Sequence, residues 1–174
     1  MKGLHIDDTT EYPARFTKVF GSVLEAFAPH YWYIDGYGPF SITDKPNFSE
    51  LDSELDRLSV EIEGCEYGPL GLWRPGILPW AADLLVVDEG TTLIGILGDE
   101  RNAAATAQEI RKQLSVFSPL FFELIEKKAD VALLYIDGWW EVYSANPRIM
   151  AQVACIQGAY ETDSDVLCRR MNSK

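Results

Sequence analysis

Apolar residues recur at three- and four-residue spacing in several segments of the chain, which predicts amphipathic helices. The clearest stripe lies within a helix predicted over residues 10–28, which has a threonine and a proline at its start and Pro29 just after its end. Similar stripes predict helices over residues 47–58 and 101–114, and a capping residue followed by a proline predicts two more over 118–128 and 146–157.

Short apolar and aromatic runs separated by turn residues predict β-hairpins. Asp-Gly turns join the strands predicted over 31–42 and over 131–143, and a third hairpin is predicted over 84–97, near the sheet centre because it is almost wholly apolar. Helices and hairpins in irregular order favour an α+β fold, an antiparallel or mixed sheet of several hairpins with about four to five helices packed on it.

The length of the chain favours a single domain. A chain of 174 residues can bury a full core but is short for two independent domains. We therefore expect one globular domain over 1–174, with a polar, frayed tail at 160–174.

The charge balance disfavours polyanionic partners. The chain has 15 basic and 27 acidic residues, a formal charge of -12, and such a surface repels nucleic acid and anionic lipid while attracting basic proteins. No apolar run has the length of a membrane span, and the first residues lack the pattern of a signal peptide. We expect a cytoplasmic protein that binds neither nucleic acid nor membranes.

Residues that carry chemistry are sparse. Cys65, Cys155 and Cys168 are widely spaced, which predicts free thiols or packing residues and no metal site. The glycines do not form a phosphate-binding loop, so no cofactor is expected. Of the two imidazoles, His30 is a better candidate base than His5, although a structural role beside aromatic residues fits it better. We assign no catalytic residue.

The strongest site candidate is an acidic segment over 44–66 that holds eight acidic and two basic residues. One interpretation is a solvated helix followed by an edge strand that its charges protect from self-pairing. The other is a docking surface for a basic protein. The adjoining loop over 67–80 is rich in glycine, proline and aromatic residues, which serve as interface anchors or as a cover for the core. The predicted partner-binding residues are Asp52, Glu54, Asp56, Glu61, Glu63, Tyr67, Trp73 and Trp80.

In size, charge and the Asp44 to Trp80 region, the chain resembles the immunity proteins of bacterial polymorphic and contact-dependent toxin systems. The resemblance implies stoichiometric inhibition of a cognate toxin. The carboxylates that would face basic groups of the toxin are those of Asp52, Glu54, Asp56, Glu61 and Glu63. An acidic chaperone for a secreted effector is an alternative, and it would be a homodimer that binds an extended segment. A small hydrolase is a third, and would need carboxylates converging on His30 in a deep pocket.

Overall fold

A computed structural model of the chain describes residues 1–7, 14–36, 48–62, 71–82, 84–87, 90–113 and 118–171. The main sheet comprises β1 (Lys2–Asp7), β3 (Tyr31–Asp35), β4 (Ser59–Val60), β5 (Gly71–Trp73), β7 (Thr92–Ile96), β8 (Val131–Ile136), β9 (Trp139–Tyr143) and β10 (Ala159–Asp163). Its strand order is β10-β1-β9-β8-β7-β3-β5-β4, and every neighbouring pair is antiparallel. A separate two-stranded sheet joins β2 (Ala14–Arg15) to β6 (Val86–Val87).

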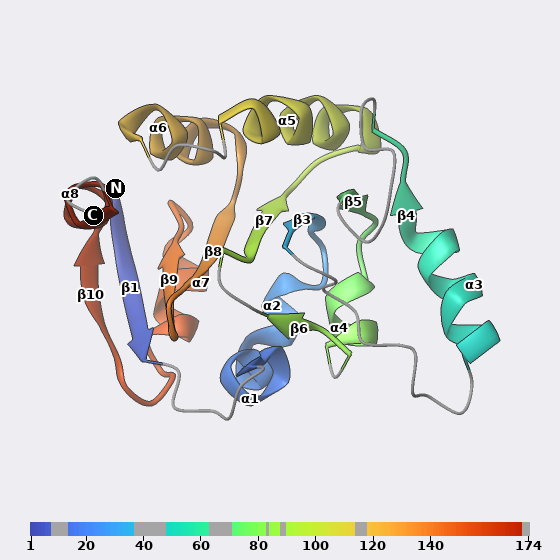
Figure 1. Ribbon diagram of the computed structural model, residues 1–174, viewed down its shortest axis with the longest axis horizontal. Helices are drawn as coiled ribbons and strands as arrows, with labels where there is room; N and C mark the ends of the chain where they lie inside the picture. Colours follow the sequence, from blue (N-terminus) through green and yellow to red (C-terminus); the bar gives the residue numbers. More distant parts are fainter. Residues whose placement is uncertain are drawn as a thin grey trace.

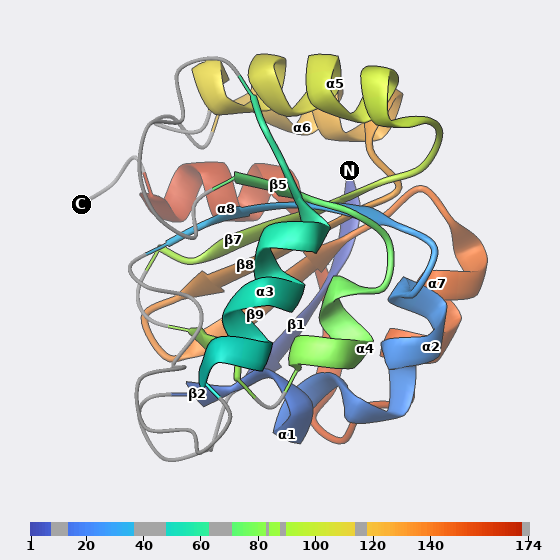
Figure 2. The same cartoon turned by 90° about the vertical axis from the view of Figure 1, so that its right-hand side faces the viewer.

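Helices cover both faces of the main sheet (Figures 1 and 2). On one face lie α5 (Glu100–Gln113), α6 (Pro119–Lys128) and α8 (Ser164–Met171). On the other lie α1 (Phe16–Phe20), the 3₁₀ turn η1 (Gly21–Val23), α2 (Leu24–Phe27), α4 (Ile77–Ala81) and α7 (Pro147–Val153). Helix α3 (Phe48–Leu58) leads into β4 at one end of the sheet.

The alternation of side chains along each strand divides the interior into two cores. In β8 every residue is buried, and Val131 and Leu133 enter the first core while Ala132 and Leu134 enter the second. The first core lies under α1, α2, α4 and α7, and the second under α5, α6 and α8. A strand that is buried on both faces has apolar residues at successive positions. This is why apolar and polar residues do not alternate over 131–136.

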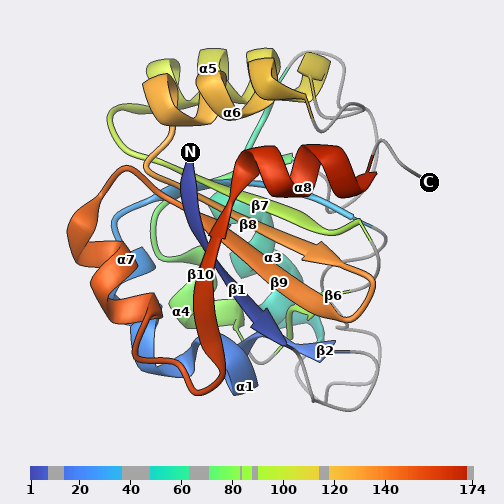
Figure 3. The same cartoon turned by 90° about the vertical axis from the view of Figure 1, so that its left-hand side faces the viewer.

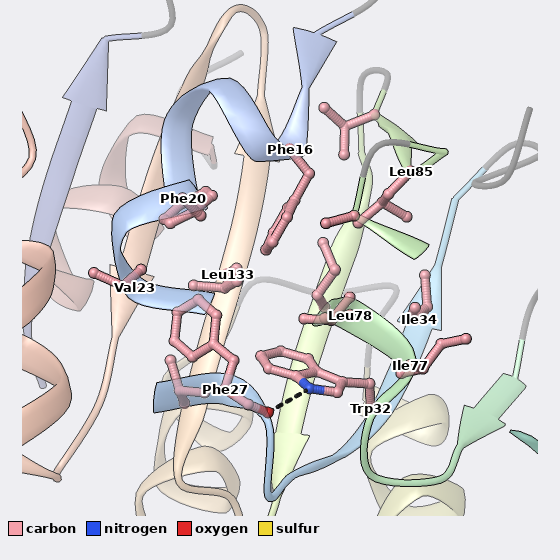
Figure 4. Close-up of a cluster of buried hydrophobic side chains, with 14 of the residues drawn as sticks. Phe16, Phe20, Val23, Phe27, Trp32, Ile34, Ile77, Leu78, Leu85 and Leu133 are labelled. Atoms are coloured by element: carbon pink, nitrogen blue, oxygen red, sulfur yellow. Dashed lines mark hydrogen bonds between the residues drawn. The ribbon is translucent and has the colours of Figure 1, made fainter. Parts of the chain in front are cut away.

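Several aromatic rings pack together in the first core (Figure 4). Phe16, Phe20 and Phe27 from the first helical segment meet the fully buried Trp32 of β3 and Trp140 of β9. The indole N–H of Trp32 donates to the Phe27 carbonyl at 3.2 Å, so its polar atom is satisfied inside the core. The apolar stripe predicted for this segment is therefore buried, as expected.

The α+β class with an antiparallel sheet is confirmed, and so is the hairpin over 131–143. Strands β8 and β9 pair through Ile136 and Trp139. The two turn residues, Asp137 at φ 49° and Gly138 at φ 92°, both have the positive φ that a type I′ turn requires.

Of the other two predicted hairpins, the one over 84–97 is wrong, and the second strand of the one over 31–42 lies outside the described residues. Strand β3 has β5 on one side and β7 on the other. Within 84–97, β6 pairs with β2 while β7 takes the predicted central place between β3 and β8. Apolar content correctly predicted the strands β3, β6 and β7, but each of them pairs with strands that lie far away in the sequence.

Two boundaries also differ from the prediction. The first helical segment begins at Phe16, because Ala14–Arg15 form β2, and residues 10–13 lie outside the described ranges. The tail predicted to fray over 160–174 instead forms regular structure as far as residue 171. Strand β10 pairs with β1, and Leu167 and Cys168 of α8 enter the second core. Helices α4 and α8 were not predicted.

Candidate functional site

The acidic segment forms an amphipathic helix and a short strand at one end of the sheet. Leu55 and Leu58 of α3 are buried in the first core, and Val60 of β4 is buried in the second. Glu61, directly after β4, is exposed. The predicted helix and half-buried strand are thus present, with polar side chains on the outer surface.

Arg74 fixes the junction between α3 and β4. Its guanidinium donates to the carbonyl of Arg57 at 2.9 Å and to that of Ser59. The same group forms an ion pair with Glu100 at the start of α5, with Nε 3.0 Å from Oε2. Carbonyls at a helix C-terminus lack partners within the helix, so Arg74 satisfies them and holds the acidic segment in place.

The carboxylates of this segment are not equivalent. Glu54 accepts two hydrogen bonds from Arg57 on the same helix, at 2.9 and 2.7 Å. Asp56 and Glu61 are exposed, and neither forms an ion pair within the part of the chain that the structure describes. The uncompensated negative charge of the described site therefore lies on Asp56 and Glu61.

The two tryptophans of the adjoining loop have different environments. Trp73 lies in β5 with 6% of its surface exposed and belongs to the first core. Trp80 lies on α4 and is 38% exposed. Helices α3 and α4 both contribute to the first core. Trp80 is thus accessible, whereas Trp73 covers the core, as the alternative interpretation of this loop expected.

The remaining predicted site residues are only partly placed. Asp52 belongs to α3, but its side chain is outside the described part of the structure. Glu63 and Tyr67 also lie outside the described residues. The described candidate site therefore consists of Glu54, Asp56, Glu61 and Trp80.

A second polar cluster, which the sequence did not suggest, surrounds His5 in β1. Its Nδ1 lies 2.9 Å from Oε1 of the buried Glu141, and its Nε2 lies 3.1 Å from Asp7. The ring stacks between Tyr160 and Trp139, at centroid distances of 4.5 and 5.7 Å. The only sequence signal was a glutamate within the apolar strand β9.

Glu141 has a further partner in Tyr143, whose hydroxyl donates to Oε2 at 3.2 Å. Burial, followed by the charge and hydrogen bond of Glu141, raises the pKa of Tyr143 well above its ordinary value near 10. Tyr143 is therefore a neutral donor. The cluster ties β1 and β9 together beneath α8, whose Arg170 lies 4.0 Å from Glu141.

His30, the better candidate base from the sequence, also sits in a hydrogen-bonded cluster. Its Nε2 lies 2.7 Å from Asp130, and its Nδ1 lies 3.2 Å from the Phe27 carbonyl. Asn146 donates to the same Asp130 carboxylate at 3.2 Å. These contacts join three connections: the one before β3, the one before β8 and the one before α7.

Neither imidazole is arranged as a catalytic base. Every ring nitrogen of His5 and His30 already faces an acceptor oxygen. A general base needs a free nitrogen within reach of the substrate proton. Both clusters instead satisfy buried polar groups and connect strands.

Metal and thiol chemistry gain no support from the described residues. Among them, no group of three or more His, Cys, Asp or Glu side chains is placed to hold a metal ion. Cys155 is an exposed free thiol and Cys168 a buried one, as predicted, and Cys65 lies outside the described residues. Burial, with the nearby Asp165, raises the pKa of the Cys168 thiol, which makes it a poor nucleophile.

Comparisons of the chain with protein-family models, with curated proteins and with solved structures gave no match. Among the helices of the described ranges, none combines the length and apolar character needed to cross a bilayer.

Proposed function

We propose that this protein neutralises a cognate protein toxin by forming a stoichiometric complex with it, as immunity proteins do. The observation that carries the proposal is the α3–β4 edge, where Asp56 and Glu61 are exposed and unpaired within the described ranges. These two carboxylates face basic side chains of the partner. Trp80, on α4, contributes apolar contact area.

Preorganisation makes this edge suited to binding. Arg74 fixes the end of α3 by its bonds to the carbonyls of Arg57 and Ser59, so the acids that flank it need little ordering when a partner arrives. Binding loses less free energy when the contacting groups are already in position. The formal charge of -12 also accelerates the approach of a cationic protein at low salt.

The partner is accordingly a basic protein, and a nuclease-like toxin with a cationic substrate groove has the matching chemistry. Carboxylates placed in such a groove occupy the positions of substrate phosphates. The proposed place of action is the cytoplasm, where the toxin would otherwise reach its substrate.

A pull-down tests the proposal directly. The purified full chain is used as bait in lysate of its source, at low and at high salt. We expect one stoichiometric basic protein that is retained at low salt and reduced at high salt, because salt screens exposed charges. The captured protein should be toxic when expressed alone and harmless when co-expressed. Capture of no partner at either salt contradicts the proposal.

Matched charge reversals locate the surface. Asp56→Lys and Glu61→Lys should each weaken the complex several-fold, and together by about tenfold or more, because like charges then meet across the interface. Glu126→Lys is the control, since Glu126 is also exposed and without an ion pair in the described structure, but lies on α6 across the sheet. Equal losses for Glu126→Lys and Asp56→Lys would mean that only the net charge matters. Glu54 is a poorer choice, because reversing it also breaks its bond to Arg57.

Stoichiometry separates the proposal from the chaperone alternative. An inhibitor of this kind forms a complex with a folded toxin domain, whereas an effector chaperone is a homodimer that binds an extended segment. Light scattering on the purified protein and on its complex distinguishes the two. A stable homodimer that captures only unfolded effector segments would favour the chaperone.

A further inference from the structure

The far end of the sheet from α3 and β4 is formed by β10. Its inner side pairs with β1 at five consecutive positions, from Lys2 opposite Asp163 to Ile6 opposite Ala159. Its outer side has no strand partner in the described structure. Figure 3 looks onto this end, and no described element crosses in front of the strand. An unpaired strand edge presents N–H and C=O groups that can pair with another chain.

The register shows which backbone groups point outward. The N–H of Ser164 donates to the Met1 carbonyl at 2.9 Å, so these residues form a hydrogen-bonded pair. Hydrogen-bonded and non-hydrogen-bonded pairs alternate along an antiparallel ladder. Glu161, opposite Leu4, is three positions before Ser164 and is therefore in a non-hydrogen-bonded pair with respect to β1. Its N–H and C=O point to the open edge.

The side chains of this edge are acidic. Glu161 and Asp163 share one face of β10, and Glu161 is exposed and forms no ion pair within the described ranges. The Asp163 carboxylate accepts the N–H of Asp165, which is the main reason that its pKa lies below the ordinary value, and the N-terminus and Lys2 add to this effect. Asp163 is therefore ionised and its charge is partly compensated, whereas the carboxylate of Glu161 has no ion-pair partner within the described ranges.

These charges disfavour pairing with a second copy of the chain. A two-fold axis at Glu161 places the two Glu161 carboxylates opposite each other. A shift to the next symmetric register, with the axis at Thr162, places Glu161 opposite Asp163 of the other copy. Like charges directly opposite each other destabilise an antiparallel pair, and both of these registers bring acid against acid. The register with the axis at Tyr160 avoids that contact, but it pairs only residues 159–161 of the strand.

We propose that the open edge of β10 binds an extended, lysine- or arginine-rich segment of a protein partner as an added antiparallel strand, paired through the backbone of Glu161. Main-chain hydrogen bonds supply affinity in this mode of recognition, and alternate side chains supply specificity. A basic residue opposite Glu161 gives the favourable cross-strand pair that a second copy cannot give. This surface is separate from the α3–β4 edge, and either can bind without the other.

A peptide titration tests the proposal on the full chain. The probe is a capped heptapeptide of sequence Thr-Lys-Val-Lys-Val-Lys-Thr, and its control carries glutamate in place of each lysine. Backbone amide resonances of the isotopically labelled protein are followed by NMR. We expect the lysine peptide to shift the amide of Glu161 and slow its hydrogen exchange, and the glutamate peptide to do neither.

Two variants separate backbone pairing from attraction between charges. Glu161→Pro removes the outward N–H, a change that an edge strand tolerates, and should weaken peptide binding about tenfold or more. Glu161→Lys keeps the N–H and should reverse the preference, so that the glutamate peptide binds more tightly than the lysine peptide.

Glu126→Lys is the control and should leave the affinity for the lysine peptide within about twofold of the wild-type value. Failure of the lysine peptide to bind, binding that shifts α3 and not β10, or unchanged affinity in Glu161→Pro would overturn the proposal. The result of the toxin pull-down, with the wild type and with the Asp56 and Glu61 variants, does not depend on any of these outcomes.

Discussion

At the scale of single residues, the least expected feature is the polar cluster of His5, Glu141 and Tyr143. Glu141 is 1% exposed and accepts hydrogen bonds from both His5 and Tyr143. A buried carboxylate destabilises a fold unless such partners surround it. The cluster therefore stabilises the packing of β1 on β9 only while each member keeps its partner.

Removing one donor should show this dependence. Tyr143→Phe keeps the ring but removes the hydroxyl that bonds Glu141 at 3.2 Å. We expect a loss of about 1–3 kcal/mol in the free energy of unfolding, because the buried carboxylate loses a partner. Urea denaturation followed by circular dichroism measures it. Tyr160→Phe is the matched control, since Tyr160 is 51% exposed, and it should change little.

Alkaline pH provides a second readout of the same variant. In the folded protein the pKa of Tyr143 is raised, so above about pH 10 the unfolded chain releases a proton that the folded protein retains. Stability from this group is thus complete below pH 10 and decreases as the pH rises further. Tyr143→Phe should lose less stability than the wild type over that range. Parallel curves would show that Tyr143 is not the titrating group.

At the scale of elements, the central strand β7 depends on a glycine. A Cβ at Gly95 would lie 2.7 Å from Val131 Cγ1 on β8 and 3.2 Å from both His30 and Trp32. The missing side chain is what allows the ring of Trp32 in β3 and the ring of His30, just before β3, to pack against β7. Among the described residues, Gly71 in β5 has no such neighbour within 4 Å.

Two alanine substitutions should therefore have unlike effects. Gly95→Ala should destabilise the fold by about 1–3 kcal/mol, the usual result of overpacking a core. Gly71→Ala should be neutral or slightly stabilising, because it restricts the unfolded chain without a clash. Thermal unfolding of both variants measures the difference. Equal stabilities would mean that β7 shifts at little cost in free energy.

At the scale of the whole molecule, the formal charge of -12 opposes compactness. Four of the described ion pairs, Glu54–Arg57, Arg74–Glu100, Glu123–Lys127 and Glu109–Lys128, lie between partly or largely exposed side chains. Pairs of this kind contribute little, so the long-range repulsion between like charges should dominate the response to salt.

Salt should consequently stabilise the protein. Raising sodium chloride from about 10 mM to about 200 mM shortens the range of the repulsion more than it weakens the few ion pairs. We expect the melting temperature to rise by about 2–4 °C, which corresponds to about 1 kcal/mol for a chain of this size. Differential scanning calorimetry measures it. A decrease would mean that the ion pairs outweigh the net repulsion.

The sequence by itself determined the local elements. Helical spacing identified the stripes of α3 and α5, a cap residue followed by proline identified α6 and α7, and Asp137-Gly138 identified one hairpin with its turn type. It also identified the acidic segment at the α3–β4 edge as the candidate site. These features depend on neighbours within a few residues, which periodicity and turn chemistry report directly.

Only the tertiary structure decided which strands pair and which polar side chains meet. β3 lies between β5 and β7, and His5 meets Glu141 across 136 positions of sequence. Only the tertiary structure shows that Trp80 is accessible while Trp73 is buried, and that β10 has an open edge. Strand pairing and burial arise from packing between distant segments, and no local pattern in a single sequence encodes that packing.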